Sequence, residues 1–352
     1  MTGAHDDVTP RPVPGVADTV GLGGVHVDPV WRTRTALRPV EAALLRTWPV
    51  RRLGLVAHAG AVATVTTQTY SRLEHSLGVL GLVAHLAADD ATTRVAALLH
   101  DVGHAPLSHT LEGIGGIDHH RTGARRVRGL GAVLADHGLD AEAVLATVAG
   151  ERPSVLAPRP GLMTLDHLDS YVRSAHAHGR AMPAPADLLG DLTVDDGAVR
   201  TSAATASVLD GLVEAEVAYH RSELNVLAVG VVRHLVRRWV GDGGADAVAR
   251  VGAMTDAELV AALLAHPRTA DDTRRFLADP LAWRVVPAGP GAPPDGAEPV
   301  PAVRPYLTRA LVTGQPTPRA VPAPALGHDH WVVPEGEARA QPRTDPAAHV
   351  WV

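Results

Sequence analysis

The sequence predicts a mostly α-helical protein. Hydrophobic residues make up 46% of its 352 residues and aromatic residues only 3%, so the core must be built from leucine, valine and alanine. Leucine and alanine favour helices, and the β-branched and aromatic runs typical of strands are few. Of the 28 prolines, 14 fall between Pro287 and Pro346, a density that excludes regular helix. We therefore expect a flexible N-terminal tail (1–20), a helical core (21–285) and a Pro-rich, irregular C-terminal region (286–352).

Apolar spacing locates the elements along this core. Residues 21–36 mix glycine with valine and suggest a short extended segment. The longest helical pattern runs from Thr205 to Val240, where leucine and valine recur at helical spacing. A short ordered insert is expected at 303–313, inside the Pro-rich region. Other helices are expected at residues 38–48, 70–89, 92–101, 119–136, 161–178, 255–264 and 271–277.

Composition excludes several classes of protein. The 32 basic and 38 acidic residues give a net charge of −6, without the basic excess of a nucleic-acid-binding surface. The absence of cysteine excludes disulfides and thiolate metal sites, so any metal must be bound by His, Asp or Glu. The N-terminal stretch has acids and prolines where a signal peptide needs basic and apolar regions, and no apolar run approaches the roughly 20 residues of a membrane span. We expect a cytoplasmic protein without a membrane partner.

The most informative segment is an apolar run (95–99) that ends abruptly in the string HDVGH (100–104). Burying these polar groups without partners would cost several kcal/mol, so they should be paired or bound to a metal. A divalent cation accepts neutral imidazole and carboxylate together. Adjacent helical residues reach one ion only near a helix end, which Gly103 and Pro106 indicate. The segment predicts a hydrolytic metal site; the alternative is an ordinary helix C-terminus at which His100 meets the helix dipole.

Two further segments supply candidate ligands. His75 lies in the string RLEHSLG, and Arg72, one helical turn before it, is well placed to hold a phosphate in a bidentate manner. Alone, His75 would be interpreted as a capping or core histidine. Downstream, Asp166 and Asp169 share one helical face at i,i+3 spacing. Asp169 is expected to form a helix pair with Arg173, so Asp166 is the better ligand candidate.

Together these motifs resemble the HD-domain metal-dependent phosphohydrolases. The strings RLEHSLG (72–78) and LHDVGHAPLSH (99–109) are similar, more narrowly, to the deoxynucleoside triphosphate triphosphohydrolase branch, which includes the dGTPase-type and the SAM-and-HD-domain enzymes. The string DHLD (166–169) with Arg173 is similar to the later aspartate motif of that branch. The resemblance covers roughly residues 25–240 and implies an HD-domain helical bundle with a metal site between its helices.

The resemblance implies a role for each matching residue. The metal ligands would be His75, His100, Asp101 and Asp166. The catalytic residues would be His119, His104 and Asp101. The residues that contact the substrate would be Arg72, His109, His120, Arg173, His220 and Arg221. The ion would be Mn, Fe, Co, Ni, Mg or Zn, since two histidines and two aspartates suit all of them.

The expected reaction is attack of water on a phosphorus atom of a nucleotide or another phosphorylated small molecule. In the triphosphohydrolases this attack falls at the α-phosphorus and releases triphosphate, which is the leading hypothesis for this chain. The chain departs from the family where sugar and base contacts are expected. Arg52 replaces a base-reading glutamine, His120 an acidic residue, Ser170 a tyrosine and Ser174 an aspartate.

Three other interpretations stay open. The chain would be a nucleoside monophosphate phosphatase on the same scaffold, or a nucleotide-binding regulator with little turnover. It would be a di-iron HD enzyme if His104, His109 and the His119–His120 pair completed a two-metal site bridged by Asp101. Related enzymes assemble as oligomers, which leaves a homodimer or a larger assembly open as well.

Overall fold

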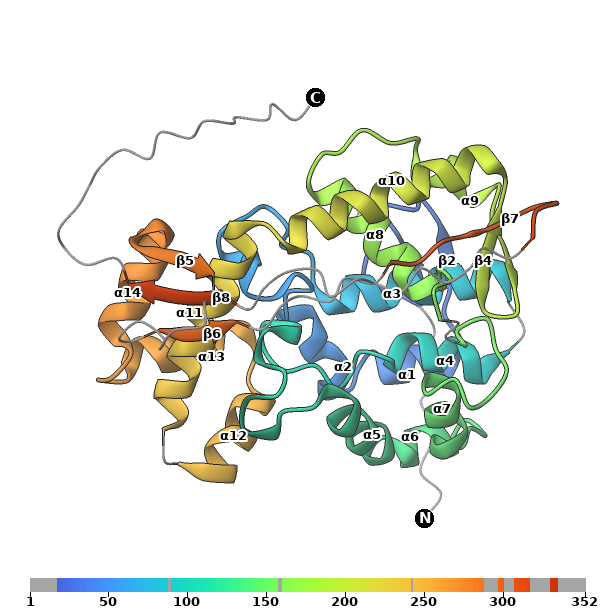
Figure 1. Cartoon of the computed structure of the whole chain (residues 1–352). Helices are drawn as coiled ribbons and strands as arrows, with labels where there is room; N and C mark the ends of the chain where they lie inside the picture. The colour runs from blue at the N-terminus through green and yellow to red at the C-terminus, as the bar shows by residue number, and fades with distance from the viewer. Residues whose placement is uncertain are drawn as a thin grey trace, which may run out of the picture.

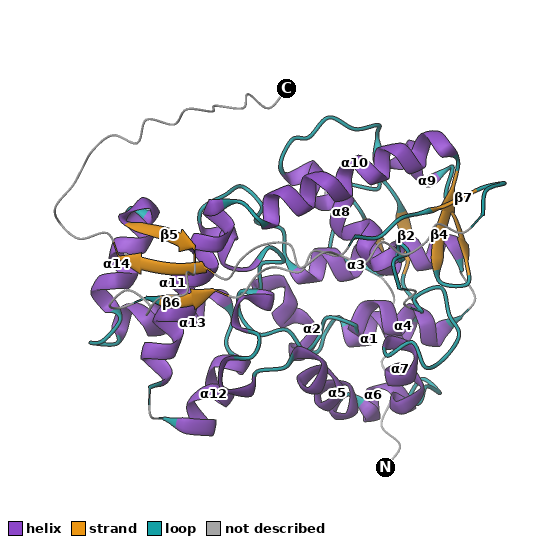
Figure 2. Cartoon of the chain, in the orientation of Figure 1, coloured by secondary structure: helices purple, strands orange, loops and turns teal. Residues whose placement is uncertain are grey.

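Helices make up most of the described chain, which confirms the mostly α-helical prediction (Figure 2). The computed structural model describes residues 18–87, 90–157, 160–241, 243–287, 297–300, 307–316 and 330–334. The predicted N-terminal tail lies almost entirely outside these residues. Figure 1 shows two groups of helices side by side, a larger one that holds α1 to α10 and a smaller one that holds α11 to α14. The larger group packs around one apolar core, and the smaller group forms a second core together with residues 61–62 and 107–114.

The larger group begins with an antiparallel hairpin of β1 (Val25–Val27) and β2 (Arg34–Ala36), within the segment predicted to be extended. Its helices are α1 (Pro39–Leu44), α2 (Trp48–Arg51), α3 (Arg72–Leu86), α4 (Ala91–Leu99), α5 (His119–Gly129), α6 (Gly131–Ala135), α7 (Ala141–Val148), α8 (Leu165–Ala177), α9 (Pro185–Leu189) and α10 (Ala203–His220). Short 3₁₀ turns lie between them at η1 (Arg52–Leu55), η2 (Gly60–Thr64), η3 (Ser108–Leu111) and η4 (Ile114–Gly116). Helix α3 packs against both α4 and α8, so these three helices form the centre of the group.

Polar caps set where the helices near the predicted site begin. The Ser71 side chain accepts the backbone N–H of Glu74, and the Glu74 carboxylate accepts the backbone N–H of Ser71, a capping box that starts α3. Asp90, Asp118 and Thr164 cap α4, α5 and α8 by accepting the N–H three residues later. Local sequence therefore determines the first turns of α3, α5 and α8, where His75, His119 and Asp166 lie.

The single long helix predicted from Thr205 to Val240 is wrong, because the chain forms two helices there. Helix α10 ends at His220, and α11 (Glu223–Val240) begins after Ser222, whose extended backbone and side-chain cap on the Asn225 N–H start a new helix. The apolar spacing continues across the break and therefore does not reveal it. The break is where the chain passes from the first core to the second, since α10 packs in one and α11 in the other.

The smaller group contains α11, α12 (Gly244–Ala253), α13 (Asp256–Ala265), α14 (Ala270–Ala278) and the turn η5 (Pro280–Ala282). Helix α11 packs against an antiparallel sheet whose strand order is β5 (Trp283–Pro287), β8 (His330–Pro334) and β6 (Glu298–Val300). A second small sheet joins β3 (Thr193–Asp195), β4 (Ala198–Thr201) and β7 (Leu311–Val312). The described part of the Pro-rich region thus contributes three short strands, and β7 lies inside the predicted ordered insert.

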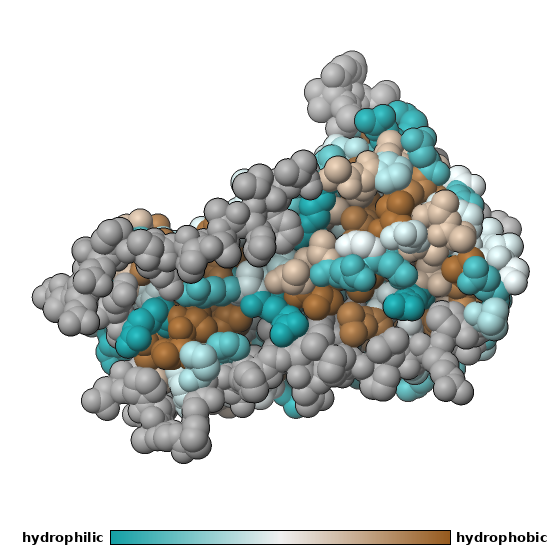
Figure 3. Space-filling model, turned by 45° about the horizontal axis from the view of Figure 1, so that its top comes forward, coloured by the Kyte–Doolittle hydropathy of each residue, from teal (hydrophilic) through white to brown (hydrophobic). Residues whose placement is uncertain are grey.

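The surface drawn in Figure 3 carries apolar patches that are interrupted by hydrophilic residues. In the part of the chain that the structure describes, every helix is too short or too polar to cross a lipid bilayer.

Replacement of Gly103 by alanine is expected to destabilise the fold. A Cβ at Gly103 would overlap the carbonyl oxygen of His119 and the backbone of Gly123, which belong to α5. These backbone atoms can move only if α5 moves, so we expect Gly103→Ala to cost about 2 kcal/mol or more in the free energy of unfolding, measured by chemical denaturation. Gly131→Ala in α6 is the matched control, because its Cβ would meet nothing within 4 Å. Equal stabilities of the two variants would contradict this prediction.

Candidate metal centre

Three helices bring the four predicted metal ligands together. His75 lies in the first turn of α3, His100 is the C-cap of α4 with Asp101 next to it, and Asp166 lies in the first turn of α8. The Nε2 atom of His75 is 3.0 Å from Oδ1 of Asp166, 3.2 Å from Nε2 of His100 and 3.8 Å from Oδ2 of Asp101. The Nε2 atom of His100 is 3.5 Å from Oδ1 of Asp101 and 3.8 Å from Oδ1 of Asp166. The four side chains therefore point at one small volume.

This donor set fits a divalent cation. Two imidazole nitrogens that face each other at 3.2 Å need a proton or a cation between them, because both can accept and neither is anionic. Two carboxylates and two neutral imidazoles offset the charge of a divalent ion without a thiolate. The Asp166 side chain is 44% exposed whereas His75 is buried, so the cluster opens to solvent on the α8 side. An ion and a phosphate would reach it from there.

A buried hydrogen-bond chain orients His75. Its Nδ1 atom lies 2.8 Å from Oδ2 of Asp169, a fully buried carboxylate. Asp169 also accepts hydrogen bonds from Nε1 of Trp31 and Nε of Arg173, each at 2.7 Å. A histidine whose Nδ1 is held by a carboxylate presents Nε2 in a fixed direction, as metal-binding histidines do. The expected pairing of Asp169 with Arg173 is present, and Asp169 in addition supports a candidate ligand.

The prediction that Arg173 contacts the substrate is wrong. Arg173 is only 3% exposed, and its guanidinium pairs with Asp28 as well as with Asp169. Its guanidinium is held by these two buried carboxylates, and moving it to a phosphate would leave both without this partner at a large desolvation cost.

Charge coupling sets the protonation of the cluster. Burial disfavours the charged form of His75, but hydrogen bonds to Asp166 and Asp169 outweigh it and raise the pKa of His75 to about 9. Burial would also raise the pKa of Asp101, yet the neighbouring Arg72 guanidinium and the histidines around it hold this pKa well below its usual range. At neutral pH the metal-free cluster thus holds a proton on His75, where a cation would take its place.

Arg72 lies beside the cluster, as predicted for a phosphate contact. Its NH1 group donates to Oδ2 of Asp101 at 2.7 Å, its Nε donates to Oγ of Ser108 at 2.8 Å, and its NH2 group donates to the carbonyl of His58 at 3.3 Å. These three hydrogen bonds do not exhaust the donors of a guanidinium, so Arg72 can still meet a phosphate oxygen.

A second histidine cluster adjoins the first. The rings of His104, His109 and His119 have centroids 4.4 to 4.9 Å apart, and one nitrogen of each lies within 4.8 Å of the others. Oδ1 of Asp101 is 3.0 Å from Nε2 of His104, so Asp101 touches both clusters. Burial and the charge of Arg72 lower the pKa of His104 to about 3, which leaves a neutral imidazole at physiological pH.

Two side chains at the centre escape the sequence analysis. Glu112 places Oε2 3.0 Å from Nδ1 of His119 and lies three residues after the histidine-rich string 99–109, a proximity in sequence that marks it as a candidate partner. The ring of His58 lies 4.6 Å from that of His75 and is hydrogen-bonded to the Tyr70 hydroxyl at 3.0 Å. No motif surrounds His58, so only the folded chain reveals it.

The remaining predicted residues lie at the start of α5 and at the end of α10. His120 is exposed, and its ring contacts that of His119 at a centroid distance of 3.9 Å. His220 pairs with Glu216 at 3.1 Å near the end of α10, where Arg221 is the exposed C-cap. Arg52 is buried and donates to the carbonyl oxygens of His104, Ala253 and Met254. It therefore connects the turn after α4 to the end of α12.

Comparison with known families shows which domain this segment of the chain is similar to. Residues 72–174 match the family model described as HD domain. The chain contains an HD domain. All four candidate ligands and the second histidine cluster lie within it.

Among curated proteins, the chain is 46% identical over 63 residues to an uncharacterized protein of Methanocaldococcus jannaschii, which covers 17% of this chain and 14% of that protein. It is 31% identical over 161 residues to the metal-dependent phosphohydrolase cns2 of Cordyceps militaris, which covers 44% of this chain and 45% of that protein.

The chain thus spans less than half of the length of these curated relatives. Two solved structures share the fold over a longer stretch. A hypothetical protein from Aquifex aeolicus has a TM-score of 0.58 at 19% identity, covering 72% of this chain and 74% of that one. A phosphohydrolase from Bacteroides thetaiotaomicron has a TM-score of 0.60 at 16% identity, covering 77% and 81%. The helical frame around the HD domain is therefore a known one.

Metal binding to the HD domain is expected to release a proton and to strengthen with pH. The Nε2 atom of His75 can bind a cation only after it loses its proton, so affinity for Mn²⁺ should rise with pH and level off above about 9. Calorimetric titration of metal-free protein in buffers of different ionisation enthalpy should detect about one proton per ion at pH 7. Asp169→Asn, which removes one carboxylate that favours protonated His75, should release less. Affinity that is independent of pH between 7 and 9 would contradict this.

Proposed function

We propose that this chain is a metal-dependent phosphohydrolase that acts on a nucleotide, and that it hydrolyses (deoxy)nucleoside triphosphates with release of triphosphate. The observation that carries the proposal is the juxtaposition at Asp101. This carboxylate belongs to a two-histidine, two-aspartate cluster, accepts a hydrogen bond from Arg72 and contacts His104 of the second histidine cluster. The residues that we assign to a cation, to a phosphate and to proton transfer thus lie next to one another within residues 72–174.

The residues divide the chemistry between them. His75, His100, Asp101 and Asp166 would hold the ion, which when bound polarises a phosphoryl oxygen and lowers the pKa of water. Arg72 offsets charge on the phosphate oxygens. In the proposed reaction water forms a new bond to the α-phosphorus, and the bond to the nucleoside 5′-oxygen breaks. A proton leaves the water and another reaches the departing oxygen.

His119 is the group we assign to this proton transfer. Glu112 holds its Nδ1 atom at 3.0 Å, which fixes the ring and leaves Nε2 for exchange with the reacting oxygens. A positioned acid or base of this kind typically contributes about 10²–10⁴-fold to the rate. His104 stacks on His119 at a centroid distance of 4.4 Å and, as a neutral imidazole, adds no competing positive charge.

Recognition of the nucleoside differs from the family pattern. Ser174, where the family has an aspartate, donates to Glu216 and accepts from Nε2 of Gln68 at 3.1 Å. Ser170, where the family has a tyrosine, faces Nε2 of His58 at 3.4 Å. The nucleotide assignment therefore depends on the phosphate and metal motifs, and the base and sugar preference must be measured.

The decisive experiment measures phosphate, pyrophosphate and triphosphate release from a panel of nucleotides, with Mn, Mg, Co or Fe added to metal-stripped protein. We expect triphosphate from deoxynucleotides and a loss of about a hundredfold or more in Asp101→Asn, which loses the charge that the ion and Arg72 require. Asp195→Asn, whose exposed carboxylate pairs with Arg200 in the small sheet, is the control and should retain turnover. Orthophosphate from monophosphates would instead identify a nucleotidase.

Silence across the panel, with the metal still bound, would overturn the nucleotide-hydrolase proposal. Tight nucleotide binding without product would then favour a nucleotide-binding regulator with little turnover. This alternative is based on the residues that differ from the family pattern at Arg52, His120 and Ser170.

A second candidate, a two-metal HD enzyme, is favoured by one specific observation. The nitrogens of His104, His109 and His119 lie within 4.8 Å of one another, and Asp101 contacts both clusters. Asp101 would then bridge two ions, and His119 would be a ligand and not a proton donor. Elemental analysis separates the two candidates, because one ion per chain supports the single-metal hydrolase whereas two ions with an iron absorption band support the alternative.

A further inference from the structure

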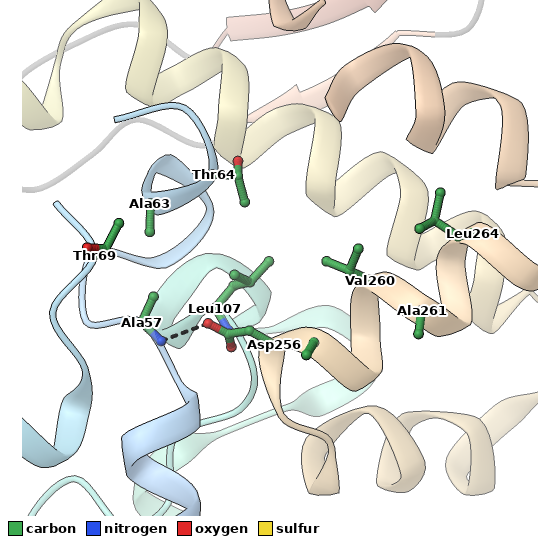
Figure 4. Close-up of a pocket in the computed structure, with 10 residues that line it drawn as sticks. Ala57, Ala63, Thr64, Thr69, Leu107, Asp256, Val260, Ala261 and Leu264 are labelled. Carbon is green, nitrogen blue, oxygen red and sulfur yellow. Dashed lines mark hydrogen bonds between the residues drawn. The ribbon is translucent and has the colours of Figure 1, made fainter. Parts of the chain in front are cut away.

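One acidic side chain from outside the HD domain connects the two loops that border the site. Asp256 is the first residue of α13, in the smaller helical group. Its Oδ2 atom accepts the backbone N–H of Ala57 at 2.7 Å, and its Oδ1 atom accepts the backbone N–H of Leu107, also at 2.7 Å. Figure 4 shows the Asp256 carboxylate directed at the Ala57 nitrogen. The two acceptor atoms of one carboxylate thus hold together chain segments that are distant in sequence.

The second of these loops has an unusual backbone. Leu107 and Ser108 have φ angles of +53° and +54°, so two consecutive residues with side chains occupy the left-handed region. Each such residue costs roughly 1 kcal/mol or more and persists only where its surroundings hold it. Asp256 accepts the N–H of the first of the two, and the Ser108 hydroxyl donates to the Ala57 carbonyl at 2.6 Å. The loop is therefore held from both sides.

This backbone positions groups of the site. Oγ of Ser108 accepts the Nε–H of Arg72 at 2.8 Å, and the same guanidinium donates to Oδ2 of Asp101 at 2.7 Å. His109, a member of the second histidine cluster, is the next residue in the chain. A change in the backbone at Leu107 and Ser108 would therefore alter the direction of Arg72 and of His109 together.

Among the described residues that line this region, Asp256 supplies the charged acceptor. Ala57, Leu107 and Asp256 line a cavity of about 460 Å³, whose other lining residues are apolar apart from Thr64 and Thr69 (Figure 4). If the carboxylate is removed, the amides of Ala57 and Leu107 lose their acceptors on this apolar wall, and the two segments lose the bonds that join them.

We propose that Asp256 is a positioning residue of the site: it holds the Ala57 and Leu107 segments in register, so that Ser108 directs Arg72 toward Asp101. The role in turnover rests on the proposed function, whereas the role in holding the loops does not. The smaller helical group thereby becomes a functional part of the site through α13, although the HD domain itself ends at residue 174.

The test compares Asp256→Ala with Glu258→Ala, which changes another acidic residue in the first turn of the same helix. Glu258 closes the capping box with Thr255 and is exposed, so its loss weakens α13 without touching the site loops. Amide hydrogen exchange of the full chain should accelerate about tenfold or more at Ala57 and Leu107 in Asp256→Ala only. Asp256→Asn keeps one acceptor oxygen, so it should preserve protection at one of the two amides and serves if the alanine variant does not fold.

Turnover and the affinity for inorganic triphosphate are measured in the same variants. We expect Asp256→Ala to lower turnover and the affinity for inorganic triphosphate about tenfold or more, with metal content unchanged, while Glu258→Ala leaves both near the wild-type values. Ser108→Ala should lower them too, and the double variant should lose less than the product of the two single losses, because both act through Arg72. Equal losses in Asp256→Ala and Glu258→Ala, or fully multiplicative losses in the double variant, would overturn the proposal.

Failure of the proposed function gives a different result. If the wild-type chain hydrolyses nothing, amide exchange and triphosphate binding still test Asp256. Unchanged exchange at both amides in Asp256→Ala would refute the positioning role whatever the activity.

Discussion

The buried carboxylate of Asp169 is the constraint on which the site depends. It accepts hydrogen bonds from His75 on α3, Trp31 in the loop between β1 and β2, and Arg173 on its own helix. An unpaired carboxylate at this depth would destabilise the fold by several kcal/mol, so the folded state needs these partners. Arg173 also forms an ion pair with the buried carboxylate of Asp28. The interactions that stabilise the buried charge of Asp169 therefore also fix the orientation of His75, a candidate metal ligand.

The second helical group supports the site in two ways. Its helix α11 forms an apolar core with residues of the site loops, including Leu107, Leu111 and Ile114. Arg233 on α11 also donates to the carbonyls of Thr110 and Glu112, which follow His109. From the larger group, Arg52 and Arg126 donate to carbonyls in the turn after α4 and at the end of α12. Loops with left-handed residues acquire a single conformation through such contacts.

Asp101 connects the two histidine clusters through direct contacts. Its two oxygens are divided between Arg72 on one side and His104 on the other, with His75 and His100 within 3.8 Å. A carboxylate with this many cationic or polar neighbours stays ionised, which a cation-binding group must do at every physiological pH. Substitution at this position therefore affects ion binding, the phosphate contact and the neighbouring imidazoles simultaneously.

The sequence by itself determined the helical class, the first turns of the helices that carry the site, and the four candidate ligands. The helices follow from local rules, namely capping residues and apolar spacing, whereas the ligand set follows from the resemblance of the sequence motifs to a known family. Only the tertiary structure decided that Arg173 is a core ion pair, that the helix expected over 205–240 breaks at Ser222, and that the Pro-rich region supplies strands to two sheets. It also revealed His58, which belongs to no motif, beside His75. These features depend on which groups meet across the fold, and a pattern along one segment carries no information about its distant partners.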